Sequence, residues 1–268
     1  MTQLPPIIKP AAPEHTHRVL LTVSYDGTAY AGWQRQTNAV AVQQRLEEAL
    51  AQLTGAPAPV TGASRTDAGV HALAQRAHFD TQSSIPASRF PFALNPLLPP
   101  DIRVIGGQEV SSDFHARFDA NGKWYTYRIY NAPHASALYR NITWHVPVRL
   151  NIENMRKSLQ DLLGTHDFCA FQASGGTAKT TVRTIDRFSL ERQDELITLK
   201  IHGNAFLYNM VRIIAGTLYE IGVGRLSIQA FAEALATGDR LALGMTAPAC
   251  GLELTRVEYP DGLLENEK

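Results

Sequence analysis

Alternating and periodic apolar positions divide the chain into strands and helices between residues 18 and 259. Runs rich in β-branched and aromatic residues predict strands at 18–25, 72–80, 102–110, 123–130, 142–146, 181–190, 195–202 and 252–259. Apolar side chains at helical spacing, with Gly or Pro as end signals, predict helices at 42–53, 88–98, 152–163, 206–223 and 227–236. This order of elements predicts an α+β architecture with helices over a largely antiparallel sheet.

A polar turn, Gly62 to Ala72, separates the first long helix from the second strand and carries one carboxylate, Asp67. Its glycines allow a tight backbone and keep side chains away from an approaching ligand. One interpretation is an Asx turn in which Asp67 caps its own backbone. The other is a catalytic carboxylate mounted on a rigid sheet edge, with Arg65 beside it as a cation that suits a phosphate. Arg65 favours the second interpretation, because a purely structural turn does not need it.

Arg212 stands out in the predicted helix 206–223, because its neighbours from Met210 to Ile214 are otherwise apolar. A guanidinium buried there alone would be very costly, so it must reach solvent, pair with an acid or face a site. Asp67 is the acid that we expect to pair with it.

Aromatic residues gather in a loop at 25–36 and in the strand at 123–130. In the loop, Tyr30 and Trp33 are interleaved with Arg and Gln, which suits stacking on RNA bases as well as simple packing, and both interpretations stay open. In the strand, alternation places Tyr125 on a face where its hydroxyl needs a partner that a pocket would supply. A structural role is favoured for His115, in the mixed cluster before this strand.

Composition narrows the class of protein without indicating an activity. The 268 residues are 44% hydrophobic and 19% charged, as expected for a globular protein with a sizeable core. The formal net charge is zero, which argues against a non-specific nucleic-acid coat protein but allows a structured RNA site. The two cysteines suit neither a disulfide framework nor a zinc site, and no glycine-rich nucleotide-binding motif is present. Charges interrupt the apolar stretch 205–223, so no membrane span is expected and a cytoplasmic protein is the default.

Four stretches, taken in order, resemble the TruA family of tRNA pseudouridine synthases. They are Tyr25-Asp26-Gly27-Thr28 with Gly32-Trp33-Gln34-Arg35-Gln36, then Arg65-Thr66-Asp67-Ala68-Gly69-Val70-His71, then Asp113-Phe114-His115-Ala116-Arg117-Phe118 with Tyr125-Thr126-Tyr127, and finally Asn204-Ala205-Phe206 with Met210-Val211-Arg212. Each stretch is weak alone. Together they span nearly the whole chain and are highly specific, and they point to the bacterial enzymes that act on the anticodon stem-loop.

The resemblance implies two α/β halves, related by a pseudo-twofold axis, that share one long sheet with a catalytic cleft between them. It implies a homodimer that isomerises uridine to pseudouridine at tRNA positions 38–40, with a flipped-out base and no cofactor or metal. Carried over by position, Asp67 would be the nucleophile, and Tyr125 would pack on the target base. Arg65 would lie where the flipped nucleotide leaves the stem, and Arg212 would pair with Asp67.

The expected domain organisation is a disordered leader at 1–17, an N-terminal half at 18–115, a C-terminal half at 116–260 and a loose tail at 261–268. Two alternative functions compete with the isomerase. One is a non-catalytic structured-RNA-binding module that stacks bases on Trp33, Tyr30 and Tyr125. The other is a glycoside-type hydrolase, whose chemistry normally needs two carboxylates where the central turn offers one.

Overall fold

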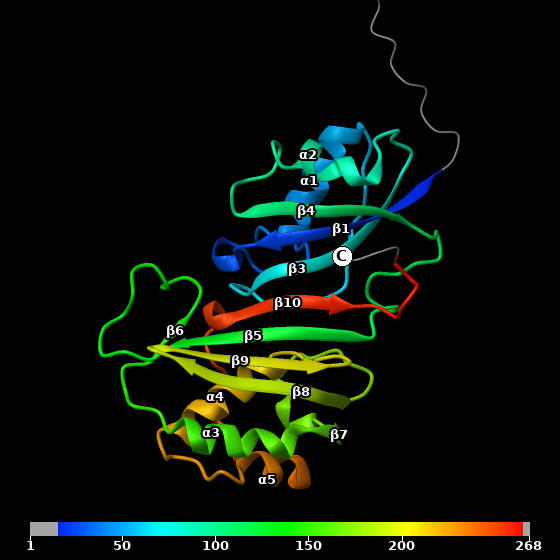
Figure 1. Cartoon of the computed structure of the whole chain (residues 1–268). Coiled ribbons are helices and arrows are strands. Elements are labelled where there is room, and N and C mark those ends of the chain that lie inside the picture. Colours follow the sequence, from blue (N-terminus) through cyan, green and yellow to red (C-terminus); the bar gives the residue numbers. More distant parts are fainter. Residues whose placement is uncertain (1–15, 265–268) are drawn as a thin grey trace, which may run out of the picture.

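One large mixed sheet with helices packed on it forms the protein in the computed structural model, which describes residues 16–264 (Figure 1). The strands are β1 His17–Tyr25, β2 Thr61–Gly62, β3 His71–Thr81, β4 Ile102–Val110, β5 Gly122–Tyr130, β6 Trp144–His145, β7 Gly164–Asp167, β8 Val182–Gln193, β9 Leu196–Gly203 and β10 Leu252–Glu258. The α-helices are α1 Val42–Thr54, α2 Phe90–Leu94, α3 Ile152–Ser158, α4 Met210–Gly222 and α5 Ala230–Thr237. The predicted α+β class is confirmed.

The main path of the sheet runs β4-β1-β3-β10-β5-β9-β8-β7, with β2 paired to β3 and β6 to β5. Every neighbouring pair on this path is antiparallel except β3 and β10, which run parallel. That parallel contact is short, with Glu253 opposite His71 and Leu254 opposite Ala72. We call it the seam, because it joins the strands from the first part of the chain to those from the second. The predicted, largely antiparallel sheet is therefore confirmed.

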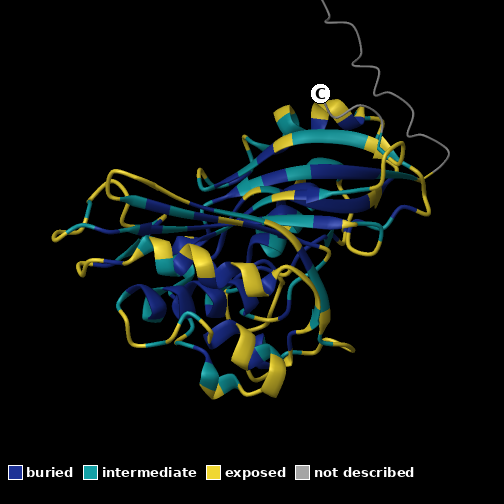
Figure 2. Ribbon diagram, turned by 60° about the horizontal axis from the view of Figure 1, so that its bottom comes forward, coloured by how far each residue is buried: buried dark blue, intermediate teal, exposed yellow. Residues whose placement is uncertain are grey.

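Helices lie at both ends of this sheet. α2 contacts β4, α1 contacts α2, and α4 packs against β5 and α3. α4 is buried over most of its length, because apolar residues occupy nearly every position that meets the sheet or α3. In Figure 2 the helices below the sheet are buried toward it and exposed on the outside, as amphipathic helices are. Among the described residues, no helix is long and apolar enough to cross a membrane.

Two helix starts differ from the sequence prediction by three residues or more. α4 begins at Met210 instead of residue 206, because Asn209 adopts a left-handed backbone with φ of 61° and the residues before it form a turn. Asn204 fixes that turn to β8, since its Oδ1 accepts from Thr184 N at 3.0 Å. α5 begins at Ala230, because the Ser227 hydroxyl accepts from Gln229 N and closes a local turn instead of capping a helix.

The expected domain boundaries stay predictions, with one adjustment at the start. β1 begins at His17, inside the expected leader. Residues 1–15 of that leader and 265–268 of the expected tail lie outside the described residues.

Candidate active site

Buried hydrogen bonds hold the turn that carries Asp67. Gln75 on β3 contacts Ser64 twice, because its Oε1 accepts from Ser64 N at 3.1 Å and its Nε2 donates to Ser64 O at 2.7 Å. The hydroxyl of Tyr25, at the end of β1, lies 2.7 Å from Thr66 Oγ1. Asp67 therefore follows a stretch of backbone that two neighbouring strands of the sheet fix in place.

Close backbone approach also fixes the turn from the side of the loop at 25–36. Gly32 has a φ of +92°, and a Cβ added to it would lie 2.5 Å from Thr66 O. Trp33 N donates to the same carbonyl at 3.0 Å. A side chain at position 32 would therefore displace the residue directly before Asp67.

We expect Gly32→Ala to lower kcat by about 10²-fold, the effect of a displacement of roughly 1 Å at a reacting group. Steady-state turnover measures it. The matched control is Gly55→Ala, because Gly55 also has a positive φ, +75°, but an added Cβ meets nothing within 4 Å. Equal turnover by the two variants would show that the close approach does not position Asp67.

Asp67 and Arg212 meet across the seam, as the sequence predicted. Arg212 Nη1 lies 3.4 Å from Asp67 Oδ2, and both side chains are largely buried. The guanidinium also donates through Nε to Ala247 O and through Nη1 to Asn209 Oδ1, each at 2.8 Å. Burial raises the pKa of the Asp67 carboxyl, and the nearby Arg212 offsets part of that rise. Because α4 begins at Met210, Arg212 lies in its first turn and not in the middle of the helix.

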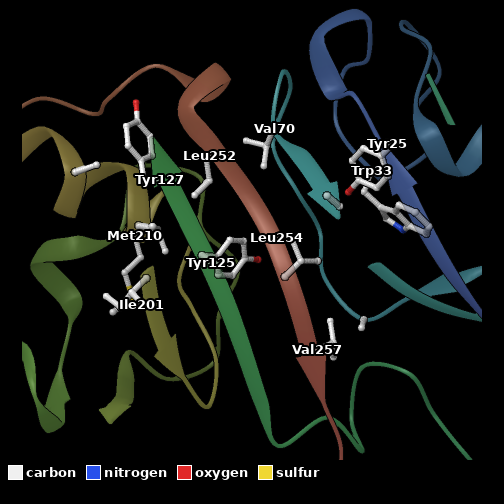
Figure 3. Packing of buried hydrophobic residues seen from close by; sticks show 14 of the residues in the cluster. Tyr25, Trp33, Val70, Tyr125, Tyr127, Ile201, Met210, Leu252, Leu254 and Val257 are labelled. Carbon is white, nitrogen blue, oxygen red and sulfur yellow. The ribbon is translucent and has the colours of Figure 1, made fainter. Parts of the chain in front are cut away.

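Tyr125 lies on β5 next to the same turn. Its hydroxyl is 3.1 Å from Ser64 Oγ, and its ring makes an edge contact with Phe206 at a centroid distance of 5.0 Å. Burial raises the pKa of Tyr125 to about 12, so the neutral phenol is the form present near neutral pH. Figure 3 shows Tyr125 between β5 and β10, beside Leu254. The expected hydroxyl partner thus comes from the turn that carries Asp67.

A cleft of about 600 Å³ crosses the seam and is lined by Ser64, Asp67, Tyr125 and Phe206, whereas Arg212 lies behind Asp67 and does not line it. Asp67 is the one acidic residue among the described residues that line it, whereas Arg65, Arg117, Lys123 and Arg183 all contribute positive charge. A glycosidase of the usual type needs two carboxylates that flank the scissile bond, so this lining does not favour that alternative. A single carboxylate in a basic cleft suits a polyanionic substrate.

Arg65 lines the cleft two residues before Asp67 and is exposed, as expected of a residue that contacts a ligand. No hydrogen bond or ion pair joins its side chain to another described residue. Its position is consistent with the predicted contact to RNA, and its role stays a prediction.

Tyr30 and Trp33 do not offer stacking surfaces. Trp33 is 3% exposed and packs near Tyr25, while Tyr30 is 7% exposed and donates its hydroxyl to Asp101 Oδ1 at 2.6 Å. The packing interpretation of this loop is therefore correct, and the interpretation in which these two rings bind RNA bases is wrong. The alternative of a non-catalytic RNA-binding module therefore lacks two of the three aromatic side chains on which it proposed that bases stack.

The sequence did not assign Lys123, Arg183 or Phe118 to the site, yet all three line the cleft. Lys123 precedes Tyr125 by two positions in a strand, which places both side chains on one face and was the available signal. His115 does not line the cleft, and its Nδ1 accepts from the backbone N–H of Phe118, in agreement with the structural role favoured for it.

The cleft sets one carboxylate among several cations, as in an enzyme with a polyanionic substrate, and comparison with known proteins gives the family. Residues 21–119 and 159–260 match the family model described as tRNA pseudouridine synthase. A curated tRNA pseudouridine synthase A from Acetivibrio thermocellus is 51% identical over 90% of this chain and 99% of its own. Its counterpart from Ruminiclostridium cellulolyticum is 49% identical over the same shares. An archaeal box H/ACA sRNP Nop10-Cbf5 complex aligns only weakly, at 10% identity and a TM-score of 0.37 over 88% of this chain and 47% of that one.

The chain belongs to the tRNA pseudouridine synthase family. This membership confirms the predicted family and the predicted enzyme class, an isomerase that acts on tRNA. The reading of the chain as a non-catalytic binding module is not favoured, and the buried loop aromatics give a structural reason.

Proposed function

We propose that this protein isomerises uridine to pseudouridine at positions 38–40 of the tRNA anticodon stem-loop, with Asp67 as the nucleophile. The observation that carries the proposal is the place of Asp67, the one acid that lines the described part of a basic cleft. Nearly full-length similarity to relatives named tRNA pseudouridine synthase A supports the choice of tRNA as substrate. The positions follow from the resemblance to enzymes of the anticodon stem-loop.

The reaction breaks the bond between uracil N1 and the ribose C1′, turns the base, and forms a bond between C5 and C1′. The C5 proton leaves and N1 gains one, so there is no net redox change. Attack at C1′, addition to C6 and abstraction of the C2′ proton would each use the same carboxylate, and each requires it to be ionised. Arg212 supports this state, because its positive charge lowers the pKa of Asp67 against the effect of burial.

A target base in or beside a stem must leave the stack before Asp67 can reach it, at a cost of a few kcal/mol. Tyr125 is placed to pack on the extruded base, since its ring and that of Phe206 line the same cleft. Arg65 is exposed at the edge of the turn, where it can occupy the space that the base leaves. These contacts would offset part of the extrusion cost.

The neutral state of Tyr125 limits what its hydroxyl can do after the base has turned. A phenol with a pKa of about 12 takes up a proton only if it passes its own to a neighbour. Ser64 Oγ, 3.1 Å away, is that neighbour in the free protein. Because Ser64 is also a neutral hydroxyl, the pair removes the C5 proton only if a water molecule accepts a proton from Ser64, and a water that acts directly as the base is the alternative.

The resemblance also implies a homodimer in which one tRNA contacts both subunits, and the sequence gives a cytoplasmic location as the default. Both stay predictions. The exposed rim of the cleft, with Phe118 and Arg117 on one side, is open to a substrate much larger than a nucleotide.

Mapping of pseudouridine after incubation of unmodified tRNA with the purified protein tests the proposal. We expect new pseudouridine only at positions 38–40, in tRNAs that carry uridine there. A tRNA with cytidine at those three positions is the control and should remain unmodified. Modification elsewhere would contradict the positional assignment, and no modification of any tRNA would contradict the proposed function.

A further inference from the structure

Three cations line one wall of the cleft without a carboxylate partner. Lys123 comes from β5, Arg183 from β8, and Arg117 from the segment that leads into β5. Within residues 16–264, none of the three forms an ion pair, whereas Arg18, Arg128 and several other arginines in this range do. Asp67, the only acid among the described residues that line the cleft, contacts Arg212 instead.

Lys123 is partly buried, and a hydrogen bond holds its ammonium inside the cleft. Its Nζ donates to Ala63 O at 2.9 Å, in the turn that carries Asp67. Burial, followed by the charges of Arg117 and Arg183, lowers the pKa of the ammonium to about 8. The surface interpretation, in which a lysine stem covers apolar area while its ammonium is hydrated, does not fit this geometry.

Arg183 also has unused hydrogen-bonding capacity. Its Nη1 donates to Val182 O at 2.6 Å, while its Nε is buried and makes no hydrogen bond. Burial lowers the pKa of this guanidinium as well. A buried donor without an acceptor costs free energy in the unbound protein.

The free protein thus keeps like charges together, partly desolvated and without counter-charge. Such an arrangement is typical of a site that a ligand completes, because a ligand anion removes both the repulsion and the unsatisfied donor. Its position fits a nucleic acid backbone. Lys123 and Tyr125 share one face of β5 about 7 Å apart along the strand, so an anion on Lys123 lies beside whatever packs on Tyr125.

We propose that Lys123, together with Arg183 and Arg117, binds one backbone phosphate of the RNA strand next to the target nucleotide. This inference rests on the proposed function and adds a positioning contact to it. Phe118 extends the same wall, because its ring is 75% exposed and stacks on His115 at 4.2 Å. A neighbouring base can stack on that ring while its phosphate lies on the three cations.

The test compares Lys123→Met with Lys200→Met. Lys200 is the matched control, because its partner Thr126 on β5 alternates with Tyr125, which places Lys200 on the opposite face of the same sheet. Both variants lose one positive charge. The substrate is an anticodon stem-loop RNA with uridine at positions 38–40. We expect the KM of Lys123→Met to be about 10- to 100-fold higher than that of the wild type, because a charged hydrogen bond to the RNA is lost, and we expect kcat to be nearly unchanged. Lys200→Met should match the wild type, and Lys123→Arg should restore most of the affinity.

The salt dependence of binding distinguishes the loss of a phosphate contact from weaker binding caused by a changed shape of the cleft. Binding is measured in an Asp67→Asn background, which prevents turnover during the titration. The slope of log affinity against log salt should become shallower by roughly 0.7 to 0.9 for Lys123→Met, the value for one phosphate contact. A stem-loop with a single neutral methylphosphonate at the linkage beside the target should bind wild-type and Lys123→Met proteins equally.

A merely structural role for Lys123 would give a different pattern. Lys123→Met should not lower the melting temperature of the free protein, because it removes charge repulsion along with one hydrogen bond. A lowered melting temperature with an unchanged salt slope would overturn the inference, as would equal KM values for Lys123→Met and Lys200→Met. If Lys123→Met and Lys200→Met had equal KM values while the wild-type protein formed pseudouridine, only this inference would fail. If the wild type formed no pseudouridine in any tRNA, the proposed function would fail and this inference with it.

Discussion

Asp67→Asn abolishes pseudouridine formation and leaves tRNA binding intact. The expected loss in turnover is at least about 10⁴-fold, because the variant lacks the one carboxylate that lines the described part of the cleft. Asn has nearly the same shape, so the cations that hold the RNA keep their places. Single-turnover release of tritium from C5-labelled uridine measures the reaction, and filter binding of the same tRNA measures affinity.

The same variant has a second expected property, which concerns stability. The pKa of Asp67 is raised in the folded protein, mainly by burial, so the folded state holds this proton more tightly than the unfolded state does. The protonated Asp67 carboxyl therefore adds to the free energy of unfolding at pH values below its unfolded pKa of about 3.9. This contribution is lost as the pH rises through the higher pKa that Asp67 has in the folded protein. At neutral pH, Asp67→Asn should melt no lower than the wild type. A variant that is inactive because it unfolds would contradict this assignment, and so would a variant with full turnover.

Arg212→Met loses both activity and stability, and its pH profile shifts. Without Arg212 the pKa of Asp67 rises further, so the acid limb of kcat/KM moves to higher pH and kcat/KM falls at neutral pH. The variant also leaves Ala247 O and Asn209 Oδ1 without their donor. We expect a loss of about 1–3 kcal/mol in the free energy of unfolding, the cost of such unpaired groups. Chemical denaturation and a pH–rate profile measure the two effects.

Arg225→Met is the control for this second prediction. Arg225 lies three residues beyond the end of α4 and pairs with Glu220 at 2.7 Å, but its side chain is 60% exposed. A surface ion pair of this kind contributes about 0–1 kcal/mol, so its loss should leave turnover and its pH dependence unchanged. If Arg212→Met matched Arg225→Met in turnover, pH profile and free energy of unfolding, the contact between Asp67 and Arg212 would contribute to neither activity nor stability.

The pair at the centre of the site was accessible from the sequence, because each member was unusual in its own surroundings. Asp67 was the lone carboxylate of a glycine-bounded turn, and Arg212 was a charge among apolar residues that required an acid. The two were predicted to pair because a buried guanidinium needs an acidic partner, and the structure places Arg212 Nη1 3.4 Å from Asp67 Oδ2. Most strands were also predictable, since β-branched and aromatic runs with clear ends describe them well, but the short strands β2 and β7 were not predicted.

Features that depend on tertiary contacts were not predictable in this way. Whether Trp33 is exposed or buried is set by the turn that packs on it, which composition does not reveal. The grouping of Lys123 with Arg183 depends on the order β5-β9-β8, because 60 residues separate them in sequence. The start of α4 depends on one left-handed residue, Asn209, whose conformation is fixed by the turn over the cleft.

The seam has a consequence for the biosynthesis of the protein. β10 is made after all the other strands, yet it lies between β3 and β5 and supplies the only contact on the main path that joins the two groups of strands in the described chain. While the ribosome still holds that segment, Asp67 and Arg212 belong to two pieces of sheet that share no strand pairing on the main path. Pairing over such long sequence separations is also slow. The sheet that carries both halves of the site can therefore be completed only after β10 has been synthesised and has paired with β3 and β5.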